Sequence, residues 1–251
     1  MEPEEFVIVV LRSLGIEVEQ IETGEGKTPD FLAHAGDSAY LIELKTKYSD
    51  PAILEERESV LARGEVFKEE TPVARRNRVS GVIASAAKQL NSYASVNHDF
   101  QLVFLLASGH HPDVQMSIFE NCLYGTKDTV DFIGEGGVLP AYFADNSDFF
   151  NLQESLDGAI VSTSHEAKLC LNPYSPRYEA LSDSELTRLF KEGVCDPLQK
   201  EREGMAFVVD GDVNRRNENE VLEFLKQKYG REKLMFIQMN HYSGTISLPH
   251  E

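Results

Sequence analysis

The first part of the chain shows two different hydrophobic periods. Across residues 3–14, apolar side chains recur at helical spacing. Residues 16–21 alternate apolar and polar side chains with a period of two, which is typical of a half-exposed strand. Two further strands are predicted for residues 30–35 and 38–46, joined by a turn at residues 36–37. The pattern therefore predicts a helix followed by three strands, of which the last two form a hairpin.

Helices and strands continue to alternate along the rest of the chain. Residues 51–70 are charged and predict a helix with a break at Gly64, and residues 73–95 predict a second helix with several small side chains. Residues 101–107 form a continuous apolar run, as expected for a buried central strand. Further helices are predicted at residues 114–124, 183–192 and 218–229, and further strands at residues 139–143, 158–161, 206–209 and 234–238.

This alternation predicts an α/β protein. A length of 251 residues suits one large domain or a core with an added lobe. We assign residues 1–125 to the core and residues 126–251 to an α/β extension of unknown role that packs on the same sheet or forms a separate lobe. Residues 125–137 are the region that we expect to be softest. No apolar run approaches the ~20 residues of a membrane helix, so we expect no membrane partner.

The cysteines and the N-terminus predict a cytoplasmic protein. Cys122, Cys170 and Cys195 are odd in number and far apart in the sequence, which fits neither a disulfide framework nor a zinc knuckle. We expect them to be small buried apolar side chains. The N-terminus is acidic, where a signal peptide would be basic.

The charge distribution is uneven. The formal net charge of −18 argues against tight unaided binding to nucleic acid, because proteins that bind phosphates usually have a basic surface. Residues 71–98, however, contain no Asp or Glu. This segment predicts a local nucleic-acid-binding stripe with strong salt dependence, made of Arg75, Arg76, Arg78 and Lys88.

The candidate chemistry lies on the predicted hairpin. Because side chains alternate along a strand, Glu43 and Lys45 should point to one face while Ile42 and Leu44 point into the core. Asp30 begins the neighbouring strand and can lie alongside. Two carboxylates and the backbone carbonyl of Leu44 suit Mg²⁺ or Mn²⁺. A lysine beside such an ion can orient water or neutralise developing negative charge, which predicts phosphodiester hydrolysis.

A solvated charge pair would give the same Glu-x-Lys letters, so the following helix provides a second line of support. Gln89 and Tyr93 are four residues apart and share a helical face, and Arg78 lies on the same stripe three turns earlier. Gln89 could contact the metal water or a phosphate. Tyr93 and the arginines could then hold the nucleic-acid backbone.

These motifs resemble those of the PD-(D/E)XK nuclease superfamily. Pro29-Asp30 is similar to its PD element, Glu43-Leu44-Lys45 to its (D/E)XK element, and residues 89–93 to the Q-x-x-x-Y motif of the RecB-type branch. The resemblance covers about residues 4–107. It implies a restriction-endonuclease-like αβββαβ core and a Mg²⁺-dependent deoxyribonuclease, and by analogy a role in defence or repair. It also implies a glutamate in the first helix, for which Glu5 is the best positional match and Glu4 is nearly as good.

Three alternatives remain open from the sequence. The first is a catalytically inactive nuclease-like module whose acidic charge favours a protein partner or a second copy of the chain. The second is a Toprim-like phosphotransfer site at Asp210 and Asp212, with residues 132–136 supplying its glutamate. The third concerns the histidine pair at residues 110–111, which could bind a metal but has no further ligand nearby in sequence, so a loop or helix N-terminus is favoured.

Overall fold

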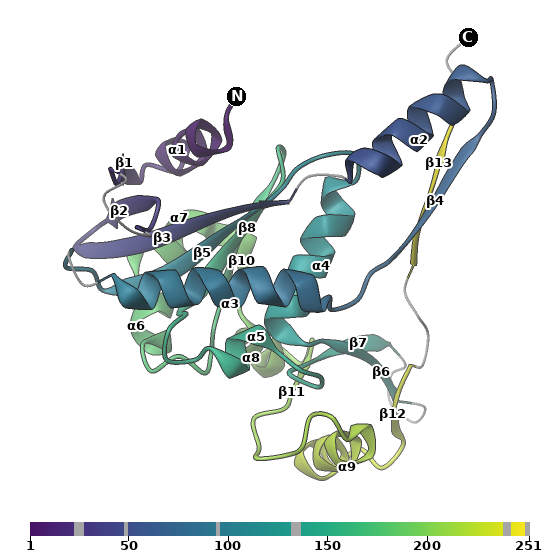
Figure 1. Ribbon diagram of the computed structural model, residues 1–251. Coiled ribbons are helices and arrows are strands. Elements are labelled where there is room, and N and C mark those ends of the chain that lie inside the picture. The colour runs from purple at the N-terminus through teal and green to yellow at the C-terminus, as the bar shows by residue number, and fades with distance from the viewer. Residues whose placement is uncertain (23–27, 48–49, 94–95, 132–136, 238–241, 249–251) are drawn as a thin grey trace.

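A seven-stranded mixed sheet forms the centre of the molecule (Figure 1). The structure is a computed structural model, and it describes residues 1–22, 28–47, 50–93, 96–131, 137–237 and 242–248. The strand order is β1-β2-β3-β5-β8-β9-β10. Their bounds are β1 Glu17–Gln20, β2 Phe31–Ala35, β3 Ser38–Lys47, β5 Phe100–Ala107, β8 Gly158–Ser162, β9 Ala167–Leu171 and β10 Val194–Cys195.

The first three strands form an antiparallel meander, and the fourth strand of the sheet keeps the direction of the third. β1 pairs with β2 and β2 with β3, both antiparallel. β5 then lies parallel to β3, and β8 lies parallel to β5. Because a parallel connection needs a crossover, the chain between β3 and β5 must leave the sheet and return. That crossover contains the helix that covers the candidate site.

Helices cover both faces of this sheet. One hydrophobic cluster lies under α1 Pro3–Ser13, α6 Tyr178–Ser182 and α7 Glu185–Phe190. A second cluster, on the opposite face, lies under α3 Asn77–Ser92, α4 Pro112–Tyr124 and α5 Asp148–Asn151. No helix in the described ranges is long and apolar enough to cross a lipid bilayer.

Strand β3 distributes its side chains between these two clusters. Leu41 belongs to the cluster under α3, whereas Ile42 and Leu44 belong to the cluster under α1. The period of two along a strand then turns Glu43 and Lys45 toward α3. This confirms the prediction that Glu43 and Lys45 point to one face of the strand while Ile42 and Leu44 point to the other.

Strands from the second half of the chain extend the central sheet and also form a second, smaller sheet. β8, β9 and β10 extend the central sheet, so residues on both sides of position 125 share one sheet and one core. A smaller four-stranded sheet has the order β11-β7-β6-β12. Its strands, and the helices beside it, are β11 Phe207–Val208, β7 Val138–Tyr142, β6 Lys127–Asp131, β12 Leu234–Phe236, α8 Pro197–Arg202 and α9 Glu218–Tyr229.

A projecting arm leaves the body between β3 and α3 (Figure 1). We use the name "arm" for α2 Pro51–Ala62, β4 Phe67–Pro72 and β13 Tyr242–Ser247. α2 contains no buried residue, and β13 pairs antiparallel with β4 along its whole length. The arm is therefore held together mainly by a ladder between two segments that are far apart in sequence.

The mixed α/β class and most of the predicted elements are confirmed, with three corrections. Residues 51–70 are not one helix, because α2 ends at Ala62 and β4 follows as a strand. α3 ends at Ser92, before the predicted end, and residues 94–95 lie outside the described ones. The predicted soft region contains the ordered strand β6, while residues 132–136 lie outside the described part.

Two buried tyrosines allow a matched test of the core. The Tyr124 hydroxyl donates to the carbonyls of Leu171 at 3.1 Å and Cys195 at 2.9 Å, which ties α4 to the ends of β9 and β10. Tyr124→Phe leaves both buried acceptors without this donor and should lower the free energy of unfolding by about 1–3 kcal/mol. Urea denaturation measures the change.

Tyr40→Phe is the control for this substitution. Tyr40 is fully buried, and its hydroxyl has no hydrogen-bond partner among the described residues. Removing that hydroxyl should leave the stability unchanged or raise it, because it relieves an unsatisfied buried polar group. A larger loss for Tyr40→Phe than for Tyr124→Phe would contradict this account of the core.

Candidate active site

The Asp30 carboxylate is fixed against the edge of β3 by the backbone. Pairing of β2 with β3 reaches Phe31 and Ile42, and the Asp30 N–H donates to the Ile42 carbonyl at 3.1 Å. One step further along β3, the Leu44 N–H donates to Asp30 Oδ2 at 2.7 Å. The Asp30 carboxylate thus accepts the hydrogen bond that a backbone carbonyl of a longer β2 would otherwise accept from the Leu44 N–H. Since N–H and C=O of one strand residue point the same way, the Leu44 carbonyl points toward this same edge.

Glu43 is the buried centre of the site. It is 1% exposed, and it shares a side-chain hydrogen bond with Asp30. Lys45 donates to Glu43 Oε1, and Gln89 Nε2 on α3 donates to Glu43 Oε2 at 2.8 Å. Gln89 Nε2 also donates to the Thr28 carbonyl at 2.6 Å, just before β2. Three side chains, those of Asp30, Lys45 and Gln89, therefore meet at the Glu43 carboxyl group.

Burial changes the protonation of both acids. It raises the pKa of Glu43 to about 7, with Asp30 adding to the rise and the Lys45 ammonium opposing it. Burial also raises the pKa of Asp30, while the Leu44 N–H and Lys45 lower it and Glu4 adds a smaller rise. Two neighbouring buried carboxyl groups titrate as a pair, so they retain a proton to a higher pH than isolated acids do.

The donor set fits a hard divalent cation. A cation can replace the shared proton of Asp30 and Glu43, and the Leu44 carbonyl supplies a third oxygen. Within the described ranges, no group of three or more His, Cys, Asp or Glu side chains could hold a metal ion. Mg²⁺ is usually bound through one or two carboxylates and keeps several waters, so a partial ligand set of this kind could hold it.

Two predicted neighbours of the site are placed elsewhere. Glu5 is the N3 residue of the α1 capping box and accepts a hydrogen bond from the Glu2 N–H at 3.4 Å. Glu4 is the acid of this helix whose charge acts on Asp30, so it replaces Glu5 as the acid of α1 near the site. Tyr93 follows the last residue of α3 with extended backbone and packs against the hydrophobic core. The expectation that it shares a helical face with Gln89 is wrong.

The four predicted basic residues divide into different environments. Arg75 forms an ion pair with the buried Asp148 at 3.3 Å, which ties the start of α3 to α5, so this residue turns inward. Lys88 is exposed on α3. Arg76 and Arg78 line a cavity of about 640 Å³, as does Lys45. Among the residues of the candidate centre, only Lys45 lines this cavity, which extends from there toward the arm.

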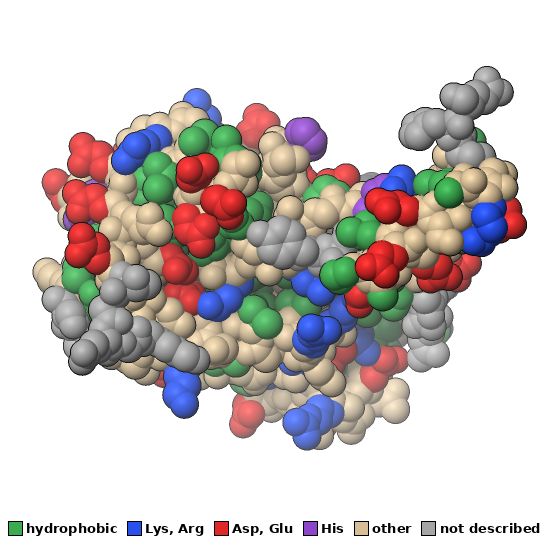
Figure 2. All heavy atoms as spheres, turned by 45° about the horizontal axis from the view of Figure 1, so that its top comes forward, with side chains coloured by type: hydrophobic (Ala, Val, Ile, Leu, Met, Phe, Trp, Pro, Cys, Tyr) green, Lys and Arg blue, Asp and Glu red, His purple; other side chains and the backbone are tan. Residues whose placement is uncertain are grey.

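Charges of both signs line this cavity. Its walls come from the ends of β3 and β5, from α3 and α4, and from the arm. In the space-filling view, Lys and Arg side chains lie near the middle of the face, whereas acidic side chains gather on its left and on the arm (Figure 2). The charged and histidine side chains in the lining are Lys45, Lys47, Arg76, Arg78, His110, His111, Asp50, Glu69 and Glu70.

The histidine pair belongs to this cavity, which the sequence did not indicate. The rings of His110 and His111 lie 4.2 Å apart, and His111 Nε2 lies 3.6 Å from Glu69 Oε2 of the arm. His111 is the N-cap residue of α4, which agrees with the predicted helix N-terminus. The pair therefore joins α4 to β4 across the cavity.

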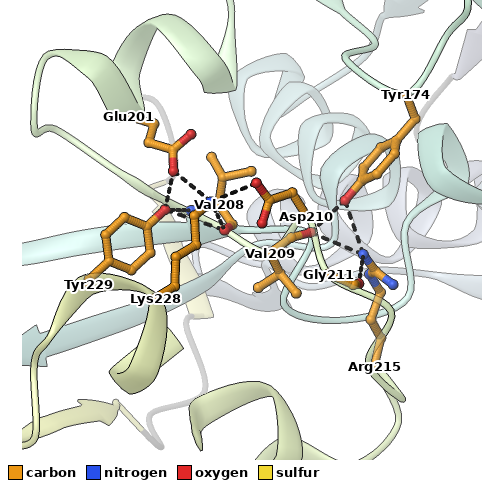
Figure 3. Close-up of polar contacts among 9 residues, drawn as sticks. All are labelled: Tyr174, Glu201, Val208, Val209, Asp210, Gly211, Arg215, Lys228 and Tyr229. Atoms are coloured by element: carbon orange, nitrogen blue, oxygen red, sulfur yellow. Dashed lines mark hydrogen bonds and ion pairs between the residues drawn. The ribbon is translucent and has the colours of Figure 1, made fainter. Parts of the chain in front are cut away.

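Asp210 belongs to a separate polar cluster (Figure 3). Lys228 lies 2.8 Å from Asp210 Oδ2 and 2.7 Å from Glu201 Oε1, and it also donates to the Val208 carbonyl. Arg215 donates to the carbonyls of Phe143 and Val209 on the other side of the cluster. These contacts tie α8, β11 and α9 together. The residues 132–136 that a Toprim-like site would need lie outside the described ones.

A pair of buried carboxyl groups, a lysine and a glutamine thus converge at the end of β3, beside a cavity. This combination defines a candidate hydrolytic metal centre. No protein-family model, curated protein or solved structure matches this chain. Its function is therefore inferred from the geometry of the centre and from the motifs that build it.

The ionisation of buried Glu43 should lower the stability of the fold. Its pKa is about 7 in the folded chain against an ordinary value of 4.5, so the folded state binds the proton more tightly. Stability is then fully present below pH 4.5 and decreases as the pH rises toward 7. Glu43→Gln removes this penalty and should be more stable than wild type above pH 7, by on the order of 3 kcal/mol.

Urea denaturation at pH 5 and pH 8, with a chelator present, measures this effect. Glu17→Gln, the same chemical change at an exposed strand position, is the control and should show no such pH-dependent gain. A Glu43→Gln variant that is less stable than wild type at pH 8 contradicts the buried, protonated state of this acid.

Proposed function

We propose that this protein is a divalent-metal-dependent nuclease of the PD-(D/E)XK type that hydrolyses DNA. The observation that carries the proposal is the hydrogen-bonded pair of buried carboxyl groups, Asp30 and Glu43, with Lys45 and Gln89 on the same carboxyl group. Further support comes from the antiparallel meander of β1, β2 and β3 and from β5, which lies parallel to β3. When α2 and β4 of the arm, which lie between β3 and α3, are left out, the order α1, β1, β2, β3, α3, β5 is compatible with the αβββαβ core that the motif resemblance implies.

Each residue of the centre has a role in this proposal. Asp30, Glu43 and the Leu44 carbonyl would hold Mg²⁺ or Mn²⁺. The bound ion supplies Lewis acidity and lowers the pKa of a coordinated water. Gln89 orients Glu43 and anchors the segment before β2 through the Thr28 carbonyl. Lys45, at the rim of the cavity, orients the attacking water and neutralises charge on the phosphoryl oxygens.

The proposed reaction is a single displacement at phosphorus. A bond forms between the water oxygen and phosphorus, and the bond from phosphorus to the 3′ oxygen breaks. The products are a 5′-phosphate and a 3′-hydroxyl. The cavity beside Lys45 offers a path for the DNA strand, with Lys47, Arg76 and Arg78 in contact with phosphates.

A non-catalytic nuclease-like module is the second candidate. It is favoured by the net charge of −18 and by the acids Asp50, Glu69 and Glu70 in the same cavity, which suit a basic protein partner. Titration calorimetry with Mn²⁺ separates the two candidates. Absence of Mn²⁺ binding, together with absence of cleavage of any nucleic acid offered, favours the binding module.

Substitution at the centre should abolish catalysis without unfolding the chain. Glu43→Gln and Lys45→Met should each lower Mg²⁺-dependent cleavage of plasmid DNA by at least about 100-fold, because each removes a group that stabilises the transition state. Gln89→Ala should lower it by about 10–100-fold, because it releases the orientation of Glu43. Excess chelator should stop cleavage by the wild type.

Asp210→Asn is the matched control for these variants. It also removes a carboxylate, but in the Lys228 cluster, so cleavage should persist. If Glu43→Gln and Lys45→Met both cleave as well as the wild type, the site assignment is wrong. If Asp210→Asn alone silences an activity, the chemistry lies in the second sheet instead.

Substitution of two nearby arginines, Arg78 and Arg75, should affect DNA binding in one case and stability in the other. Arg78 is exposed in the cavity, so Arg78→Ala should weaken DNA binding and reduce the slope of log K against log salt by about 1. Arg75→Ala leaves the buried Asp148 without its cation, so it should lower stability by about 3 kcal/mol and leave the salt slope unchanged. Binding is measured by fluorescence anisotropy over a salt series, and equal salt slopes for Arg78→Ala and wild type contradict the proposed path.

A further inference from the structure

Two of the three cysteines, far apart in sequence, are direct neighbours in the sheet. β9 and β10 are parallel, and Cys170 and Cys195 are paired positions of their ladder. Paired positions on adjacent strands lie about 5 Å apart, which is within the Cα separation that a disulfide spans. Both are free, buried thiols. A bond between them would need little movement of the backbone.

The surroundings of Cys195 favour its thiolate. Lys200 Nζ, on α8, lies 3.6 Å from Cys195 Sγ, and the Tyr142 hydroxyl lies 3.8 Å from the same sulfur. The neighbouring Cys170 thiol and the charge of Lys200 lower the pKa of Cys195 below its usual range, although burial opposes the shift. The pKa of Cys170 is instead raised well above its usual range, by the neighbouring Cys195 sulfur and by burial. One thiol of the pair is thus reactive and the other holds its proton.

The third cysteine has a different environment. Cys122 lies on α4, where its sulfur accepts a hydrogen bond from the Arg76 N–H at 3.3 Å, and burial raises its pKa. Because it lies on a helix, Cys122 has no place in the strand ladder that brings Cys170 and Cys195 together. Cys122 is therefore a buried thiol of ordinary reactivity and serves as a matched control.

We propose that Cys170 and Cys195 form a redox-active pair, in which Cys195 is attacked by a peroxide and Cys170 resolves the product as a disulfide. The Cys195 thiolate displaces hydroxide from hydrogen peroxide and becomes a sulfenic acid. The Cys170 sulfur then displaces the sulfenic hydroxyl, which leaves as water with the thiol proton. Two thiols are oxidised by two electrons, and one peroxide is reduced to water and hydroxide.

The position of the cysteine pair indicates how peroxide reaches Cys195 and what the disulfide would change in the structure. Lys200 is partly exposed and reaches from the surface to the Cys195 sulfur, which marks the side from which a molecule the size of water can approach. β10 is only two residues long and lies at the edge of the sheet. A bond from Cys195 to β9 would fix this edge strand, together with the start of α8, to the sheet.

The full-length reduced protein, freed of reductant and treated with hydrogen peroxide, tests this inference. Wild type should lose the mass of two hydrogen atoms, should keep one alkylatable thiol of its three in denaturant, and should recover all three with a dithiol reductant. Cys122→Ser should lose the same mass. In Cys170→Ser, Cys195 should instead be trapped as a sulfenic acid by dimedone, and Lys200→Met should form the disulfide several-fold more slowly.

Peptide mapping of the oxidised wild type keeps the test independent of how the variants fold. It should find the peptides of Cys170 and Cys195 linked to each other. The inference is overturned if wild type keeps three alkylatable thiols, if Cys122 takes part in the bond, or if Cys195 is oxidised without forming one. Nuclease activity does not enter these readouts, so the outcome is separate from that of the proposed catalytic function.

Discussion

Burial of one carboxyl group, that of Glu43, is the constraint on which the site depends. A carboxylate that is 1% exposed must either keep its proton or find partners for its charge. Lys45 and Gln89 supply such partners, and Asp30 shares a hydrogen bond with the same group. The helix α3 and the hairpin of β2 and β3 are joined through these contacts. A divalent cation would meet the same need, so the cost of burying these acids and the proposed catalysis have one physical origin.

Local patterns predicted much of the fold. The helix at residues 3–14, the strands of the hairpin and α9 follow from hydrophobic periods that each segment carries within itself. β4 was missed because its partner, β13, lies at the other end of the described chain, and no period within residues 67–72 reveals that partner. Two-residue strands such as β10 are too short to carry any period.

The candidate site was only partly predictable. Glu43 and Lys45 could be placed on one face because side chains alternate along a strand. Gln89 could be placed on the helix that the sequence predicts after the hairpin. The direction of Arg75 could not be predicted, since its partner Asp148 lies on another helix, and the sequence does not show which surface arginines turn inward. The neighbouring positions of Cys170 and Cys195 depend on the parallel pairing of β9 with β10, which spacing in the sequence does not encode.

The pairing of β4 with β13 also means that the arm can be completed only late in synthesis of the chain. Every described residue of the carboxyl centre belongs to the segment that ends with α3, so this part can form early during synthesis. β13 is the last of the described strands to leave the ribosome, which at ordinary elongation rates is on the order of ten seconds or more after β4. The arm, one wall of the cavity beside Lys45, therefore acquires its ladder only at a late stage. A nascent chain carries the acids before it has the complete cleft that would present a substrate to them.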